Sequence, residues 1–166
     1  TTDKSGKAQV DGLYLGSYVV RETQAPEGFV VSDKEYNVTL TYKDDHTAII
    51  SDSVTYLNDR QKVHIDLRKV DEDNEANLQG AVFGLYAAED ILAVDGTTIV
   101  SKGDLIETST SDENGQVVFN ADLPLSKYEI RELKAPIGYA SSDEVIPVDA
   151  TYKGQVLPTI EIVAVF

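Results

Sequence analysis

The chain contains no cysteine among its 166 residues, so neither a disulfide nor a thiolate-bound metal can stabilise its fold. Any covalent cross-link must therefore use other side chains. No apolar run approaches the roughly 20 residues that a membrane-spanning helix needs, which argues against membrane insertion in this segment. The first residues also lack the pattern of a secretory signal peptide, and we interpret the sequence as a segment of a longer protein.

Basic residues are few. Lys and Arg total 14 against 29 Asp and Glu, so the formal net charge is −15 at pH 7. Such an excess of negative charge excludes nucleic acid and anionic membrane surfaces as expected partners. The hydrophobic content of 42% is nevertheless enough for a packed core, and the length allows one or two small domains.

A sustained helical period is also missing, and apolar residues alternate with polar ones instead. Residues 87–107 are expected to form an irregular insertion with a hairpin turn at Asp95-Gly96, and Asn114-Gly115 predicts a type I′ hairpin turn. The alternation predicts an all-β chain, with strands at residues 18–22, 35–42, 47–50, 54–58, 63–69, 116–119, 128–132, 145–148 and 159–166, and with a turn leading into a strand across residues 78–86.

Two charged residues end strands whose faces are otherwise apolar. Period two places Glu132 on the same face as Tyr128 and Ile130, and it places Lys69 on the face of Leu67. A charged group on such a face is costly unless it is paired or neutralised. We therefore expect the side chains of Lys69 and Glu132 to be buried.

The segment around Glu132 occurs twice. Residues 128–139 read Tyr-Glu-Ile-Arg-Glu-Leu-Lys-Ala-Pro-Ile-Gly-Tyr, and residues 18–29 read Tyr-Val-Val-Arg-Glu-Thr-Gln-Ala-Pro-Glu-Gly-Phe. With this offset of 110 positions, residues 1–60 match the C-terminal half of a first module, and residues 61–166 form a second module. The second module is expected to be nearly complete and to lack only the end of its last strand.

Ordered motifs connect the chain to a known family. Lys69-Val70-Asp71 is followed by Leu-x-Gly-Ala-x-Phe-x-Leu-Tyr at 78–86, by Asp-Glu-Asn-Gly at 112–115 and by Tyr-x-Ile-x-Glu-x-x-Ala-Pro-x-Gly-Tyr at 128–139. This series resembles the Cna B-type domains, also called SpaA-like or prealbumin-like, of Gram-positive surface adhesins and pilins. The resemblance implies an all-β fold of immunoglobulin-like β-sandwich modules in tandem, each with seven strands.

The same resemblance implies a structural function, that of a stalk or spacer module in a bacterial cell-surface adhesin or pilin. The module would lie outside a Gram-positive cell, anchored to the cell wall through an anchor that is not in this segment. Its partners would be neighbouring modules of the same protein, with host extracellular matrix bound through other domains. The alternative is a module that itself binds host matrix protein or glycan, although its outward positions are mostly Thr, Asp, Glu and Lys rather than aromatic.

Domains of this family often carry an intramolecular isopeptide bond between a first-strand Lys and a last-strand Asn or Asp, with a Glu between them. On this resemblance Lys69 matches the Lys, Glu132 and Glu22 match the catalytic Glu, and Asn58 matches the Asn of the first copy. Burial favours a neutral, nucleophilic amine and a protonated Glu that polarises the amide, which supports the assignment. Such a reaction happens once per module, so we expect no enzyme of repeated turnover, no cofactor and no metal.

Neither module contains the complete set of reacting groups. Residues 159–166 include no Asn or Asp, and residues 1–58 lack the Lys of a first strand. We therefore expect Lys69 to pack in its own module and to stay unbonded in this chain. The alternative is strand exchange with another copy, in which the Lys69 strand of one chain lies beside the Asn58 strand of the other.

Each candidate also has a purely structural interpretation. Lys69 can be exposed at a frayed strand end, the two Glu residues can form ordinary buried ion pairs, and Asn58 can cap a strand. The acidic run 71–75 lacks the Gly and the Glu of a calcium loop, so no metal site is predicted there. His46 and His64 flank turns or face outward, and no nucleophile-elbow, phosphate-loop or zinc motif is present.

Overall fold

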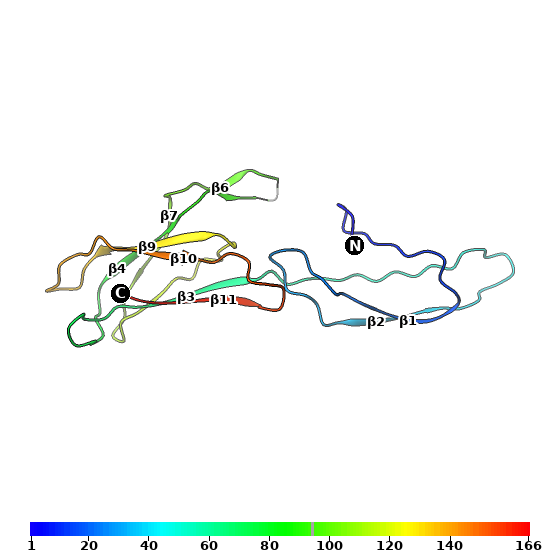
Figure 1. Ribbon diagram of the computed structural model, residues 1–166, viewed down its shortest axis with the longest axis horizontal. Coiled ribbons are helices and arrows are strands. Elements are labelled where there is room, and N and C mark those ends of the chain that lie inside the picture. The colour runs from blue at the N-terminus through cyan, green and yellow to red at the C-terminus, as the bar shows by residue number, and fades with distance from the viewer. Residues whose placement is uncertain (94) are drawn as a thin grey trace. The chain divides into compact units, whose positions relative to one another are not determined.

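The computed structural model describes residues 1–93 and 95–166, which form strands, turns and loops (Figure 1). These residues fall into two compact units. The first unit contains Thr1–Ala25 and Val31–Asn58, and the second contains Pro26–Val30 and Asp59–Phe166. Within the described part of the chain, no helix is long and apolar enough to cross a membrane.

The first unit contains one antiparallel hairpin, formed by β1 (Gly16–Arg21) and β2 (Glu35–Leu40). The strands predicted at 47–50 and 54–58 are not formed, so this part of the prediction is wrong. A strand needs a neighbour for its backbone hydrogen bonds, and the described residues of the first unit hold no strand besides β1 and β2. Alternation of apolar residues without such a neighbour does not produce a ladder.

In the described residues of the second unit, the strands are β3 (Lys62–Arg68), β4 (Val82–Ala87), β5 (Ile91–Leu92), β6 (Thr98–Val100), β7 (Leu105–Thr110), β8 (Gln116–Val118), β9 (Lys127–Lys134), β10 (Val145–Asp149) and β11 (Thr159–Val165). One sheet has the order β10-β9-β4-β7, and the other has the order β11-β3-β8. Neighbouring strands are antiparallel except β3 and β11, which run parallel (Figure 1).

The two sheets enclose one hydrophobic core. Ile65 and Leu67 of β3 point into it from one side, and Phe83, Tyr128 and Ile130 point into it from the other. Each of these residues is at most 1% exposed. Burying a large apolar side chain stabilises a fold by about 2 kcal/mol, so this layer holds the two sheets together. The fold is the β-sandwich that the family resemblance implies, with seven strands in its two sheets.

Residues 87–107 are more regular than the irregular insertion that the sequence predicts. β5 and β6 form a short hairpin that projects from the sandwich, and β7 begins within the same stretch (Figure 1). The predicted turn is present, because Gly96 has a φ of 85° and the Thr97 N–H donates to the Asp95 carboxylate. Val94, which also belongs to this stretch, lies outside the described residues.

The predicted type I′ turn at Asn114-Gly115 is wrong. A type I′ turn needs positive φ at both central residues, but Asn114 is not among the positive-φ residues. The Asp112 carboxylate instead accepts the N–H groups of Asn114 and Gln116, each at 2.8 Å. The turn connects β7 of one sheet to β8 of the other, because each of these strands finds its partner elsewhere.

The sequence repeat has a counterpart in structure. Tyr18 pairs with Val38 in β1–β2, and Tyr128 pairs with Val148 in β9–β10. Each Tyr hydroxyl donates to the backbone carbonyl four residues earlier, at 2.7 and 2.6 Å. Burial differs, since Tyr128 and Val148 are at most 2% exposed whereas Tyr18 and Val38 are only partly buried. The opposing sheet of the second unit accounts for this difference.

Candidate functional site

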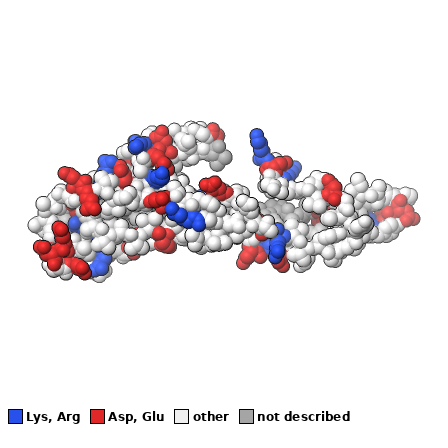
Figure 2. Space-filling model, in the orientation of Figure 1, with Lys and Arg blue, Asp and Glu red and all other residues white. Residues whose placement is uncertain are grey.

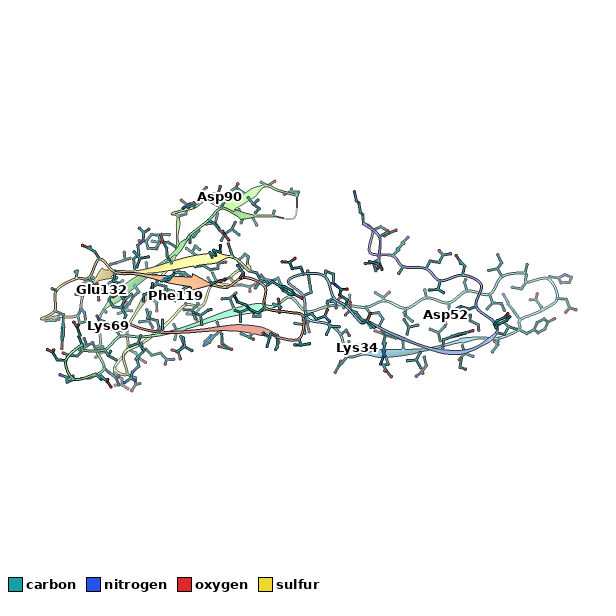
Figure 3. All side chains as sticks on the ribbon, in the orientation of Figure 1. Lys34, Asp52, Lys69, Asp90, Phe119 and Glu132 are labelled. Atoms are coloured by element: carbon teal, nitrogen blue, oxygen red, sulfur yellow. The ribbon has the colours of Figure 1, made fainter. Side chains whose placement is uncertain are left out.

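Lys69 and Glu132 face each other inside the second unit (Figure 3). Lys69 directly follows β3 in one sheet, and Glu132 belongs to β9 in the other. The Lys69 Nζ lies 3.6 Å from the Glu132 Oε1, and the exposed fractions of the two side chains are 13% and 0%. The prediction that both side chains are buried is confirmed, and the pair joins the two sheets.

Aromatic rings form one wall of this pair. The Lys69 Nζ lies 4.5 Å from the centre of the Phe166 ring, which holds a cation favourably on its face. Phe166 in turn packs edge-on against Phe83, with ring centres 5.2 Å apart. Phe166, which follows β11, is held beside Lys69 because its backbone N–H donates to the Arg68 carbonyl at 2.9 Å.

The backbone of Lys69 is fixed from both sides. Its N–H donates to the Gly115 carbonyl at 2.7 Å, and its carbonyl accepts the Leu78 N–H at 3.0 Å. A Cβ placed on Gly115 would lie only 2.3 Å from the Lys69 carbonyl oxygen. The glycine is therefore required by this close approach as well as by its φ of 73°.

The two oxygens of Glu132 have different environments. Oε2 accepts the backbone N–H of Ser142 at 3.0 Å. Oε1 is buried and accepts no hydrogen bond from the described residues, and its neighbour is the Lys69 amine at 3.6 Å. The carboxylate is thus held in place by the backbone through one oxygen while the other oxygen faces the amine.

In the first unit the equivalent glutamate, Glu22, accepts a hydrogen bond from the side-chain amide of Asn58. Oε2 of Glu22 accepts the Ser32 N–H at 2.8 Å and the side-chain N–H of Asn58 at 2.5 Å. Tyr56, two residues before Asn58, donates its hydroxyl to the Val20 carbonyl at 2.6 Å. This tyrosine fastens the segment that carries Asn58 to β1.

The structure therefore brings the predicted site residues together in two pairs, Lys69 with Glu132 and Glu22 with Asn58. Sequence reasoning assigned no role to Phe166, and it treated Gly115 only as a turn residue. It also missed the backbone N–H groups that hold the two glutamates, although Ser32 and Ser142 share the repeat offset and could have indicated them.

The acidic run 71–75 serves a structural purpose in the described part of the chain. The Tyr139 hydroxyl donates to Asp71 Oδ2 at 2.6 Å, and this bond lowers the pKa of the Asp71 carboxyl. The other Asp71 oxygen accepts the N–H groups of Asp73 and Asn74. The described residues contain no cluster of His, Asp and Glu that could hold a metal ion.

Acidic side chains occur in separate groups along both units, with basic ones between them, on the face shown in Figure 2. The second unit is defined by a sandwich of two β-sheets with an amine and a carboxyl group paired between them.

A family model identifies the family of this fold. The model for the SpaA prealbumin-like fold domain matches residues 1–54 and 63–163 of the chain. The chain therefore belongs to the family of SpaA prealbumin-like fold domains, as the sequence motifs predict. The match extends over both units, so the family assignment does not depend on the second unit alone.

Individual relatives are larger proteins. The Bacillus anthracis TIE protein is similar over 99% of this chain, with a TM-score of 0.68 and 26% identity, and 27% of that chain is covered. The trypsin-resistant surface T6 protein of Streptococcus pyogenes serotype M6 is 32% identical over 88 residues, which are 53% of this chain and 14% of the relative. The solved T6 backbone pilin, described as a modular three-domain structure, has 31% identity and a TM-score of 0.42, with 54% of this chain and 16% of that chain covered. The chain thus spans less than a third of each of these relatives.

Proposed function

We propose that this chain is a structural stalk or spacer segment of a bacterial cell-surface adhesin or pilin, stabilised by autocatalytic Lys–Asn isopeptide bonds. The family assignment and the likeness to a surface protein and a backbone pilin support the structural role. On this proposal the chain works outside a Gram-positive cell, and neighbouring modules of the same protein are its partners.

One observation carries the cross-linking part of the proposal. The same glutamate of the repeat contacts an amine in one unit and an amide in the other: Glu132 faces Lys69, and Glu22 accepts a hydrogen bond from Asn58. An amine and a side-chain amide are the two reactants of an amide-forming reaction. Each of them lies beside a glutamate carboxyl, which is the group that would transfer the proton. A complete module would hold a Lys in the place of Lys69 and an Asn in the place of Asn58 around one glutamate.

The chemistry follows from this geometry. The neutral Lys nitrogen attacks the side-chain carbonyl carbon of Asn, and the bond from that carbon to the amide nitrogen breaks. The proton released by the amine passes through the Glu carboxyl to the departing nitrogen, which leaves as ammonia. Holding the groups together in a buried site replaces an external activating agent.

The bond would stabilise a chain that has no disulfide. Linking the first and last strands of a module closes a loop of about 100 residues, which restricts the unfolded chain and stabilises the fold by roughly 4 kcal/mol. In the second unit these strands are β3 and β11, which already lie parallel and paired. A covalent link between them would also resist force applied along the stalk.

The test is the intact mass of a chain that is extended at the repeat register. Leu57-Asn58-Asp59 occupy the repeat positions that follow Phe166, so Leu-Asn-Asp is appended to the C-terminus. We expect the extended chain to lose the mass of one ammonia, and we expect Lys69→Ala or Glu132→Gln to prevent the loss. If the extended chain has the full mass calculated from its sequence, as both variants should, the isopeptide proposal is refuted.

A further inference from the structure

The loop that follows Glu22 is not part of the compact unit that contains the β1–β2 hairpin. Residues 26–30 belong to the second compact unit. The Val30 N–H donates to the Asp59 carbonyl, and the Gln61 N–H donates to the Gly28 carbonyl, both at 2.9 Å. These two bonds place Phe29 opposite Arg60 in a short antiparallel bridge. The loop therefore adds a piece of extended backbone to the start of the second unit.

The segment that receives this loop is itself firmly held. Gln61 is completely buried, and its side-chain amide donates to the Gly154 and Leu157 carbonyls, each at 2.7 Å. Arg60 forms an ion pair with Asp122. Because the receiving backbone is fixed by these contacts, it presents its carbonyl and N–H groups in a defined position.

A glycine forms the turn of this loop. A Cβ placed on Gly28 would lie 3.6 Å from the Leu125 Cδ1, so the loop backbone packs directly over this side chain. Gly28 has a φ of 84°. The glycine thus permits the turn that brings the loop backbone to the receiving segment.

The repeat places a second loop of the same construction at 136–140. The Tyr139 N–H donates to the Pro136 carbonyl at 3.1 Å, just as the Phe29 N–H donates to the Pro26 carbonyl at 3.1 Å. Gly138 has a φ of 91°, close to that of its counterpart. The two loops therefore share sequence pattern, turn geometry and place after the glutamate strand.

The loop 136–140 differs from the loop 26–30 because residues 137–140 are all exposed to solvent. Ile137 is 99% exposed, and Gly138, Tyr139 and Ala140 are exposed as well. No described heavy atom lies within 4 Å of a Cβ placed on Gly138. The Tyr139 hydroxyl, bonded to Asp71, holds the loop in shape from its own unit.

We infer that the loop 136–140 is a docking surface for the start of a further module of the same family that follows in the chain. The Ala140 N–H would donate to the carbonyl at the repeat position of Asp59, and the Gly138 carbonyl would accept the N–H at the repeat position of Gln61. This inference rests on the proposed modular role, but it does not require the isopeptide bond.

The side chain at position 137 is not part of this recognition. Glu27 occupies its place in the first loop and is exposed. Recognition instead uses backbone groups, which fits a contact that must recur between modules of different sequence. The partner is therefore defined by a buried Gln61-type anchor and an apolar residue in the place of Leu125, rather than by complementary charge.

The experiment is a fusion in which residues 1–166 are followed directly by a second copy of residues 57–166. Leu57 is the repeat equivalent of the position after Phe166, so the fusion continues the repeat in register. Amide hydrogen exchange is measured in the fusion and in the 166-residue chain. We expect exchange at Ala140 to be at least about tenfold slower in the fusion than in the 166-residue chain, because this amide gains a hydrogen bond. The second Gln61 exists only in the fusion, and there we expect its amide to exchange at least about tenfold more slowly than in the same fusion carrying Ala140→Pro.

Controls lie in the same molecule. The Val30 and first Gln61 amides already donate hydrogen bonds in the 166-residue chain, so their protection shows that the fusion is folded. Ala140→Pro, which removes the N–H donor, should abolish the added protection at the second Gln61, whereas Ile137→Glu should leave it unchanged. Protection of Val30 without protection of Ala140, or loss of docking in Ile137→Glu, would overturn the inference. Intact mass reports the isopeptide bond separately, so docking and cross-linking can fail independently.

Discussion

The side-chain amide of Asn58 donates a 2.5 Å hydrogen bond to the Glu22 carboxylate oxygen that also accepts the Ser32 N–H. In the second unit, the repeat equivalent of that carboxylate is held by the Ser142 N–H and faces the Lys69 amine. One local framework, a glutamate at the end of a strand or directly after it that is tied to the backbone ten residues later, therefore accommodates two different partners. This relationship is the structural basis of the cross-linking proposal.

The contributions of Lys69 and Glu132 to the free energy of unfolding should depend strongly on each other. Glu132→Leu leaves the Lys69 ammonium in a site where only 13% of its side chain is exposed, and we expect the free energy of unfolding to fall by about 3 kcal/mol. Lys69→Met should have a similar cost, because it leaves a completely buried carboxylate without its partner. The double variant should recover most of the loss, which denaturant unfolding can measure. Losses that simply add in the double variant would show that the two groups are independent.

Gly115 should be far less tolerant of alanine than another glycine with the same backbone geometry. A Cβ at Gly115 would lie 2.3 Å from the Lys69 carbonyl oxygen, whereas at Gly103, whose φ is 89°, it meets nothing within 4 Å. We expect Gly115→Ala to cost about 3 kcal/mol through the clash and the left-handed backbone. Gly103→Ala should cost only about 1 kcal/mol through the backbone alone. Equal shifts of the two denaturation midpoints would contradict this explanation.

The buried hydroxyl of Tyr128 should make the folded protein lose stability in alkali. Burial raises the pKa of its hydroxyl to about 12, whereas a tyrosine in the unfolded chain titrates near about 10. Because the folded pKa is the higher one, the stabilising contribution is complete below about pH 10 and is lost as the pH rises toward about 12. Tyr128→Phe should therefore lose less stability than the wild type over this window.

Tyr128→Phe should also lower the free energy of unfolding at neutral pH, for a different reason. The Tyr128 hydroxyl donates to the Pro124 carbonyl at 2.6 Å, so its removal should lower the free energy of unfolding by about 1 kcal/mol. Denaturant midpoints measured across the alkaline range distinguish the two effects. An alkaline slope that persists unchanged in Tyr128→Phe would assign the titration to other groups.

Burial followed the alternation of the sequence closely in the second unit. Tyr128, Ile130 and Glu132 share one face of β9 and are all buried, and Lys69 continues the inward face of β3. A side chain's direction in a strand depends only on the residue's parity, which is a local property of the backbone. The sequence could therefore predict that a Lys and a Glu enter the core.

The same reasoning failed where pairing depends on distant residues. Residues 54–58 alternate as regularly as β11, yet only β11 forms a backbone ladder with a neighbouring strand, namely β3, whereas residues 54–58 reach β1 through the Tyr56 hydroxyl. The turn at 112–115 has the residues of a tight hairpin, but its flanking strands belong to opposite sheets. Strand pairing requires hydrogen bonds from a second segment, and local pattern does not specify which segment supplies them.

The sequence by itself determined the all-β class, the family, the repeat and the identity of the chemical groups on the inward faces. Only the tertiary structure decided that Lys69 meets Glu132 across the two sheets, that Asn58 meets Glu22, and that residues 26–30 join the second unit. The physical reason is that composition and parity are properties of neighbouring residues. Contacts between sheets and loops depend instead on how segments far apart in the chain satisfy their hydrogen bonds and bury their apolar faces together.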